Sequence, residues 1–148
     1  MAAHVHLSHD YPHSAAALWA LATDYAALGE VNKPLVTFSG LPEGRCVTGQ
    51  KMTVDVSLFG SLPPQPYAME VLECDDAGYC LRSREAGAGV RSWLHRVQVT
   101  ATQTGARLTD DIEIDAGWLT PLFVWWARKL YSNRHGHRLR LLSEQEGV

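Results

Sequence analysis

The sequence of 148 residues contains no run of about 20 apolar residues, the length that a helix needs to cross a lipid bilayer. Its first residues, Met1 to His6, lack both the basic region and the apolar core of a secretory signal peptide. We therefore expect no stable insertion into a membrane.

Cysteine is scarce, with only Cys46, Cys74 and Cys80. Their spacing fits no metal-binding motif, and an odd number of cysteines cannot form a complete set of disulfides. Thiols that stay reduced are typical of the cytosol. The sequence therefore predicts a cytoplasmic protein.

Basic residues are also too few for a nucleic-acid-binding surface, because the formal net charge is −3. The sequence has no Gly-x-Ser-x-Gly, no phosphate-binding P-loop and no paired-glycine dinucleotide turn. Four of the seven histidines lie between His4 and His13, and His135 and His137 follow near the other end. No cysteine or carboxylate completes a ligand set with them. We expect no nucleic acid, no metal and no cofactor.

The most conspicuous pattern that is present is a long helical stretch at residues 118–146. Thr120 and Pro121 are typical of a helix start, with Thr at the N-cap and Pro at the first helical position. At 100° per residue, one stripe is apolar for three turns and then becomes polar, and we expect it to face the rest of the protein. This stripe consists of Leu119, Leu122, Phe123, Trp126, Leu130, Asn133, His137 and Leu141. About 25 helical residues span roughly 37 Å, so the helix needs a partner surface of equal length.

A run of strands supplies that surface. Alternating apolar residues and turn signals predict strands at residues 5–11, 35–39, 48–58, 67–74, 79–85, 90–102 and 106–115. Two short helices are expected at 15–22 and 25–28, the second ending at Gly29. Which face of the hairpin at 67–85 points inward stays open. The predicted fold is a single α+β domain at residues 1–148, a curved antiparallel sheet of seven strands around the long C-terminal helix.

The last hairpin allows a finer prediction when Thr104 and Gly105 form its turn. His95 then pairs with Ile114, and Asp110 shares with His95 a face that is otherwise apolar. We expect this face to lie against the long helix. In this register His95 and Asp110 are some four residues apart, too far for direct contact.

The buried carboxylate of Asp110 must be paired or protonated. Arg134 or His137 of the long helix are its expected partners, as an ion pair that joins helix to sheet. His95 is a candidate general acid or base, or else a core histidine satisfied by a neighbouring group.

The order of elements resembles that of the START-like (SRPBCC) superfamily. Local motifs are similar to those of a bacterial branch of polyketide-cyclase/dehydrase type: Leu58-Phe59-Gly60-Ser61-Leu62-Pro63-Pro64, Trp93-Leu94-His95-Arg96, Gly105-Ala106-Arg107-Leu108-Thr109-Asp110 and Arg134-His135. The loops at residues 87–90 and 115–117 depart from that branch. The resemblance implies a helix-grip fold with a cavity between sheet and helix that holds a hydrophobic ligand. Because the superfamily includes both enzymes and pure binders, fold alone does not choose between them.

The predicted site residues are those that this arrangement turns toward the cavity. They are Met52, Tyr67, Trp93, His95, Asp110, Ile112, Phe123, Trp126, Arg134 and His137. Core packing is the alternative interpretation of the aromatic residues among them. We expect binding of a small hydrophobic molecule, such as a lipid, a polyketide or an aromatic compound, without covalent chemistry. The alternative is a cyclase/dehydrase-type enzyme with His95 as acid or base and Asp110 in support. Association into a homodimer is left open.

Overall fold

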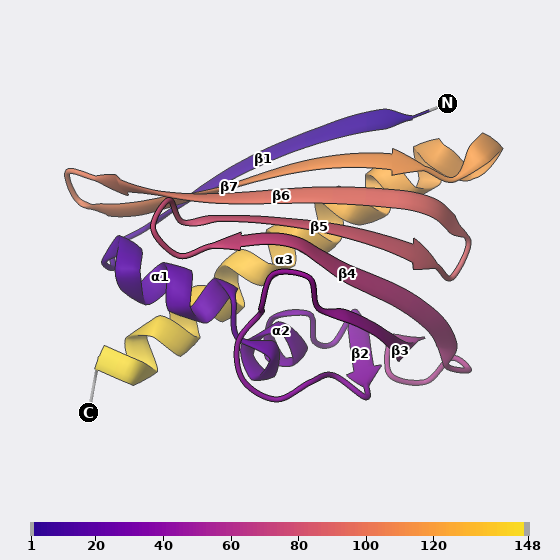
Figure 1. Ribbon diagram of the computed structural model, residues 1–148, viewed down its shortest axis with the longest axis horizontal. Coiled ribbons are helices and arrows are strands. Elements are labelled where there is room, and N and C mark those ends of the chain that lie inside the picture. The colour runs from indigo at the N-terminus through magenta and orange to yellow at the C-terminus, as the bar shows by residue number, and fades with distance from the viewer. Residues whose placement is uncertain (1, 147–148) are drawn as a thin grey trace.

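An antiparallel sheet curves around one long helix in the computed structural model, which describes residues 2–146 (Figure 1). The strands are β1 (Ala3–Tyr11), β2 (Val36–Ser39), β3 (Lys51–Leu58), β4 (Gln65–Asp75), β5 (Cys80–Gly87), β6 (Val90–Thr102) and β7 (Gly105–Asp115). The helices are α1 (Ala15–Ala22), α2 (Tyr25–Val31) and α3 (Thr120–Glu146), and a 3-10 turn, η1 (Gly117–Leu119), precedes α3. The seven strands follow the order β1-β7-β6-β5-β4-β3-β2. The predicted α+β helix-grip fold is confirmed.

The two short helices begin where the sequence predicts them. The Ser14 hydroxyl accepts a hydrogen bond from the Ala17 amide, and Asp24 caps α2 in the same way. The prediction that Gly29 ends α2 is wrong, since the helix continues to Val31. A glycine within a helix costs only about 1 kcal/mol, which the burial of neighbouring side chains offsets.

The turn of the last hairpin lies one residue earlier than predicted, at Gln103 and Thr104, because Thr102 pairs with Gly105. A Cβ atom on Gly105 would overlap the carbonyl oxygen of Tyr11 at the end of β1, so this glycine serves a close approach of two backbones rather than the turn. His95 consequently pairs with Ile112 instead of Ile114. Since the register changes by two residues, every side chain keeps its predicted face.

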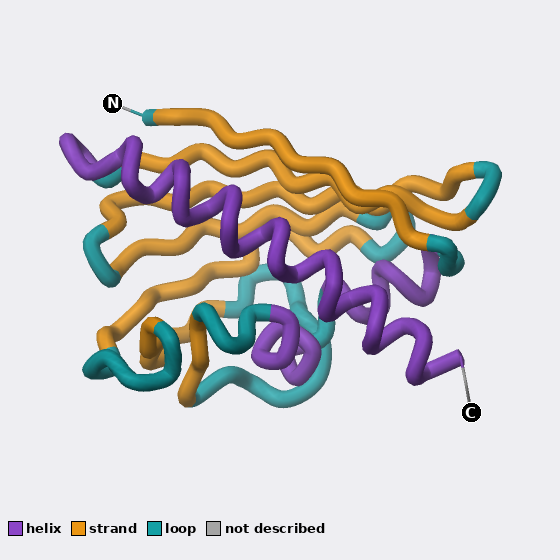
Figure 2. The backbone as a smooth tube through the Cα atoms, turned by 180° about the vertical axis from the view of Figure 1, so that it is seen from behind, coloured by secondary structure: helices purple, strands orange, loops and turns teal. Residues whose placement is uncertain are grey.

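Helix α3 crosses the sheet diagonally (Figure 2). Its buried residues are Thr120, Ala127, Leu130, Tyr131, Arg134, Arg138 and Leu142. The centre of this buried face lies about one position, or roughly 100° of rotation, from that of the predicted stripe. Leu130 belongs to both, and Leu122, Phe123 and Trp126 of the stripe line the space between helix and sheet. Asn133 and His137 of the stripe instead contact the carbonyl of Lys33. Leu122 of that stripe is 56% exposed. The true inward face includes Tyr131 and two arginines, so a search for the most apolar stripe selects its neighbour.

Thr120 does not act as the predicted N-cap. It is the first residue of α3, and its hydroxyl donates to the Gly117 carbonyl at 2.6 Å and accepts from the Ala116 amide at 3.0 Å. The hydroxyl therefore stabilises the turn before the helix.

No helix within residues 2–146 is long and apolar enough to span a membrane.

Side chains pack densely toward the C-terminal end of α3 and along its middle. Leu142 joins Leu18 and Trp19 of α1 in one core cluster, and Ala127 and Tyr131 belong to a second cluster. The remaining members of this second cluster are Val5, Val90, Trp93, Ile112 and Ile114. The space between the first half of α3 and strands β2 to β6 is filled less completely, and it contains the site described next.

Candidate functional site

A cavity of about 520 Å³ lies between the first half of α3 and the strands β2 to β6. Its wall is mostly aliphatic and aromatic. The lining residues are Val36, Phe38, Val56, Leu58, Phe59, Leu62, Pro63, Gln65, Tyr67, Glu85, Gly87, Ala88, Val90, Trp93, Leu122, Phe123, Trp125, Trp126, Lys129, Leu130, Tyr131 and Arg134. We call this space the outer cavity.

A smaller pocket of about 80 Å³ lies deeper in the molecule, and we call it the inner pocket. Phe38, Glu85 and Arg134 line both spaces, so they form the boundary between them. His95 lines the inner pocket and does not reach the outer cavity.

The predicted site residues divide into three groups. Those in the wall of the outer cavity are Tyr67, Trp93, Phe123, Trp126 and Arg134. Met52 and His95 line the inner pocket, which Arg134 also lines. Asp110, Ile112 and His137 line neither space.

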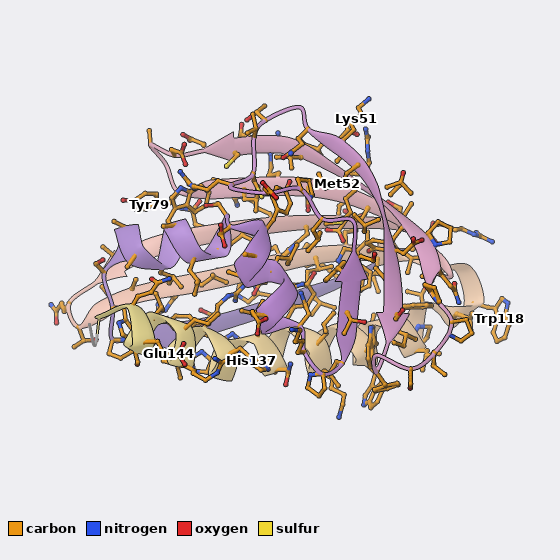
Figure 3. All side chains as sticks on the ribbon, turned by 90° about the horizontal axis from the view of Figure 1, so that it is seen from below. Lys51, Met52, Tyr79, Trp118, His137 and Glu144 are labelled. Carbon is orange, nitrogen blue, oxygen red and sulfur yellow. The ribbon has the colours of Figure 1, made fainter. Side chains whose placement is uncertain are left out.

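His137 lies at the outer side of α3, where its Nε2 atom is 2.6 Å from the carbonyl oxygen of Lys33 (Figure 3). The prediction that it faces the cavity fails because the inward face of α3 is rotated. Ile112 is fully buried in the core cluster with Val5 and Trp93. Lys51 and Met52 show the alternation of β3, with Lys51 pointing outward and Met52 inward (Figure 3).

His95 and Asp110 are in direct contact, contrary to the prediction. The His95 Nε2 atom lies 2.7 Å from Asp110 Oδ1. In the observed register the two residues are diagonal neighbours on adjacent strands, and long side chains can bridge this separation. The partner of Asp110 is therefore His95 on the neighbouring strand β6, rather than Arg134 or His137 on helix α3.

Asp110 is completely buried, and two opposing effects act on its carboxyl group. Burial raises its pKa, while the hydrogen bond from His95 and the charges of His95, Arg138 and Arg134 lower it. The net result is a lowered pKa, so Asp110 is a carboxylate. The carboxylate accepts the hydrogen bond from Nε2 of His95, so Nδ1 is the ring nitrogen that faces Tyr131.

Tyr131 connects this pair to the outer cavity, and the sequence did not single it out. Its hydroxyl accepts a hydrogen bond from Trp93 Nε1 at 3.2 Å and lies 3.5 Å from His95 Nδ1. Burial raises the pKa of Tyr131, so its hydroxyl keeps its proton. The sequence offered one indication of Tyr131, which is that it follows Leu130 of the predicted inward stripe.

Arg134 is held from two sides. Its Nε donates to Asn32 Oδ1 at 2.9 Å, and its guanidinium carbon lies 4.1 Å from the centroid of the Tyr131 ring. The second contact is a cation–π interaction. These contacts orient the rest of the guanidinium at the boundary between the outer cavity and the inner pocket.

Glu85 is the acidic group at the same boundary, and sequence reasoning also missed it. The Ser83 hydroxyl donates to Glu85 Oε2 at 3.1 Å. Burial and the charge of Glu85 raise the pKa of Tyr67 well above its ordinary value. Leu81, Ser83 and Glu85 all line the cavities, which identifies the inward face of β5 that the sequence left open.

Among the histidines near the N-terminus, His4 and His6 share one partner, since His4 Nε2 also lies 3.7 Å from Asp111 Oδ1, and His9 has a different one. His6 lies 2.7 Å from Asp111 on the outside of the sheet, and the ring of His9 stacks on His135 with centroids 4.7 Å apart. In the described part of the chain, no three His, Cys, Asp or Glu side chains are arranged to hold a metal ion.

Several solved structures share this architecture. Protein CV1439 from Chromobacterium violaceum gives a TM-score of 0.73 at 15% identity, over 94% of this chain and 96% of that chain. Norcoclaurine synthase from Thalictrum flavum, in complex with dopamine and hydroxybenzaldehyde, gives 0.66 at 14% identity, over 97% and 88%. Ara h 8.0201 gives 0.69 at 13% identity, over 95% and 99%.

At such identities the likeness shows the fold alone, which is the Bet v 1-like helix-grip fold. A search of curated proteins by sequence found no match. The sequence profile of one family matches residues 11–142, most of the chain. The chain therefore belongs to the DUF8410 family, which is described as a domain of unknown function.

Proposed function

We propose that the protein binds a small hydrophobic molecule in the outer cavity. The observation that carries this proposal is the cavity of about 520 Å³ with its largely apolar wall. Ligand pockets typically measure about 300–1,000 Å³ and combine apolar walls with a few polar groups. Protein interiors otherwise contain few voids larger than a water molecule. Another pocket of about 540 Å³ has several charged lining residues, so volume alone does not distinguish the outer cavity. Its size together with its apolar wall is what favours an apolar occupant.

The aromatic wall favours a flat ligand. Trp93, Phe123 and Trp126 present ring surfaces to the cavity, and the ring of Phe59 packs edge-on against Trp126 at 5.8 Å. Norcoclaurine synthase, which shares the fold, was solved with two aromatic molecules bound. Aromatic compounds are therefore the first class to test, ahead of lipids and polyketides.

Two leucine substitutions provide a matched test, because Leu58 and Leu94 are each 37% exposed. Leu58 lines the cavity, whereas Leu94 lies on the outer face of β6. The probe is N-phenyl-1-naphthylamine, an uncharged fluorophore whose emission rises in apolar surroundings. Leu58→Trp should weaken its binding by at least about tenfold because the larger indole occupies part of the space that the probe needs, and Leu94→Trp should change it by less than about twofold.

Absence of binding to the unmodified protein, or equal behaviour of the two variants, would contradict the proposal. Native mass spectrometry of protein purified without denaturant supplies an independent reading. A co-purified small molecule that is retained by the Leu94→Trp variant and lost from the Leu58→Trp variant would identify the natural ligand.

A second candidate function is supported by the chain of contacts from Asp110 through His95 to Tyr131. The carboxylate orients the imidazole, and the Tyr131 hydroxyl lies between His95 Nδ1 and the outer cavity. A general acid or base is commonly a histidine oriented by a carboxylate. A cyclase/dehydrase-type enzyme would use these three side chains to move a proton between His95 and a bound carbonyl compound through Tyr131.

The cytoplasmic location is inferred from the free cysteines and stays a prediction.

A further inference from the structure

Two arginines one helical turn apart are buried at the inner end of the site. Arg134 is 7% exposed and Arg138 is 4% exposed, and both line the inner pocket. Like charges at positions i and i+4 of a helix repel each other. A buried guanidinium is also costly unless its charge and its N–H groups are compensated. The pair therefore calls for a specific explanation.

The hydrogen bonds of these arginines are incomplete. A guanidinium has five N–H donors, and the Nε of Arg134 uses one of them on Asn32. The Nη atoms of Arg134 make no hydrogen bond within residues 2–146, and Nη1 of Arg138 is buried without a partner. Neither guanidinium forms an ion pair with a carboxylate of that part of the chain.

The nearby carboxylates already have other partners. Asp110 accepts from His95, and Glu85 accepts from the Ser83 hydroxyl and lies beside Tyr67. Glu85 is only partly buried at the border of the open outer cavity, whereas Arg134 is almost fully buried. Oδ2 of Asp110 is itself buried without a hydrogen-bond partner, but Asp110 lines neither space, so its charge acts on the two arginines without a hydrogen bond to them. At the boundary between the two spaces, the groups without a partner among residues 2–146 are the Nη donors of Arg134.

We propose that the ligand is an apolar carboxylic acid whose carboxylate binds Arg134 at the entrance to the inner pocket. This inference rests on the proposed function, since the apolar body of the ligand occupies the outer cavity. The planar fork of an arginine matches a carboxylate with two parallel hydrogen bonds. Asn32 and Tyr131 hold Arg134 in place before the ligand arrives, which reduces the entropy lost on binding.

The outer cavity contains a second cation that serves as a control. Lys129 is exposed, lines the outer cavity, and lies 5.7 Å from the ring centroid of Trp125. Its ammonium group makes no hydrogen bond to the described residues 2–146. Lys129 therefore has the charge of Arg134 without its fixed geometry.

The test compares three probes with the same two-ring body: 2-naphthylacetate, 2-naphthylacetamide and 2-(2-naphthyl)ethylamine. Calorimetry on the unmodified protein should give the tightest binding for the acid, at least about tenfold tighter than the amide, with the amine weakest. Arg134→Met should remove the advantage of the acid and leave the affinity for the amide within about threefold. Lys129→Met should leave the advantage intact. Glu85→Gln should tighten the acid, because it removes a like charge.

The outcomes separate this inference from the proposed function. Equal binding of acid and amide, or a preference for the amine that Glu85→Gln abolishes, overturns the carboxylate assignment and leaves cavity binding standing. Loss of the preference in Lys129→Met overturns it as well. Failure of all three probes and of N-phenyl-1-naphthylamine overturns both. If Arg134→Met does not fold, the affinities of the three probes for the unmodified protein and for Arg134→Lys test the carboxylate assignment instead. Arg134→Lys should retain only part of the preference for the acid over the amide.

Discussion

The Nε2 atom of His95 and the Oδ1 atom of Asp110 are 2.7 Å apart in the interior of the sheet, where Asp110 has no exposed surface. The two residues are 15 positions apart in the chain and meet only because β6 and β7 pair with Val97 opposite Asp110. The contact compensates a buried carboxylate and orients an imidazole whose other nitrogen faces Tyr131. Stability and any acid–base chemistry therefore depend on the same pair.

Removing the charge of Asp110 should destabilise the protein. Asp110→Asn should lower the free energy of unfolding by roughly 3–5 kcal/mol, because it breaks a buried charged contact and leaves His95 and the nearby arginines uncompensated. Urea unfolding at pH 7 measures the loss. The matched control is Asp111→Asn, whose carboxylate pairs with His6 on the surface and should cost less than about 1 kcal/mol. A similar loss in both variants would show that burial of the pair is not what matters.

Replacing His95 distinguishes binding from catalysis. If the protein only binds its ligand, His95→Gln should leave the affinity within about threefold, because His95 lines the inner pocket and does not contact a ligand in the outer cavity. If His95 is a general acid or base, the same change should reduce turnover about 10²- to 10⁴-fold and leave affinity nearly unchanged. Calorimetry and rate measurement on one ligand compare the two. No change in either quantity would leave His95 as a core residue that supports only the fold.

Two tryptophans should differ in their contribution to stability. Trp126 is partly buried and lines the outer cavity, whereas Trp19 is 3% exposed in the packed core. Trp19→Ala should cost about 3–5 kcal/mol, the typical loss for an aromatic residue in a filled core. Trp126→Ala should cost about 1–2 kcal/mol, since fewer atoms surround the ring. Comparison of the two urea midpoints checks this, and a larger loss for Trp126→Ala would mean that the cavity wall is packed as core.

Stability should fall in mild acid because of His135. Burial and the charges of His9 and Arg138 lower the pKa of His135 below its ordinary value of 6.5, despite the opposing effect of Asp10. As the pH falls, the unfolded chain therefore takes up this proton before the folded chain does. The contribution of His135 to the free energy of unfolding is complete above about pH 6.5. It is lost as the pH falls toward the lower pKa that His135 has in the folded protein.

The melting temperature measured at pH 7.5 and pH 5.5 should therefore decrease less in His135→Phe, which keeps the ring stack with His9, than in the unmodified protein. His4→Phe is the control, because the His4 side chain is 66% exposed. It should leave the decrease unchanged. An undiminished decrease in His135→Phe would assign the acid sensitivity to other groups.

The sequence by itself determined which elements form. The alternation at residues 90–102 predicts β6 with its observed ends, and Ser14 and Asp24 place the starts of α1 and α2. These features follow from periodicity and capping, which act between residues close in the chain. The faces of β6 and β7 were also predictable, since a register change of two residues leaves them unaltered.

Tertiary structure alone decided how the elements meet. The backbone of β1 approaches Gly105, and this contact between distant segments places the glycine in β7 rather than in the turn. His95 therefore reaches Asp110. Likewise, Tyr131 faces inward because Trp93 supplies its hydrogen-bond partner from another part of the chain. Arg134 was predicted to face the cavity, but only the fold shows that Asn32, and not Asp110, is its hydrogen-bond partner. A pattern that ranks residues by hydrophobicity assigns such polar groups to the surface. The site is built from interactions of this kind, because polar groups become buried only where the fold brings their partners to them.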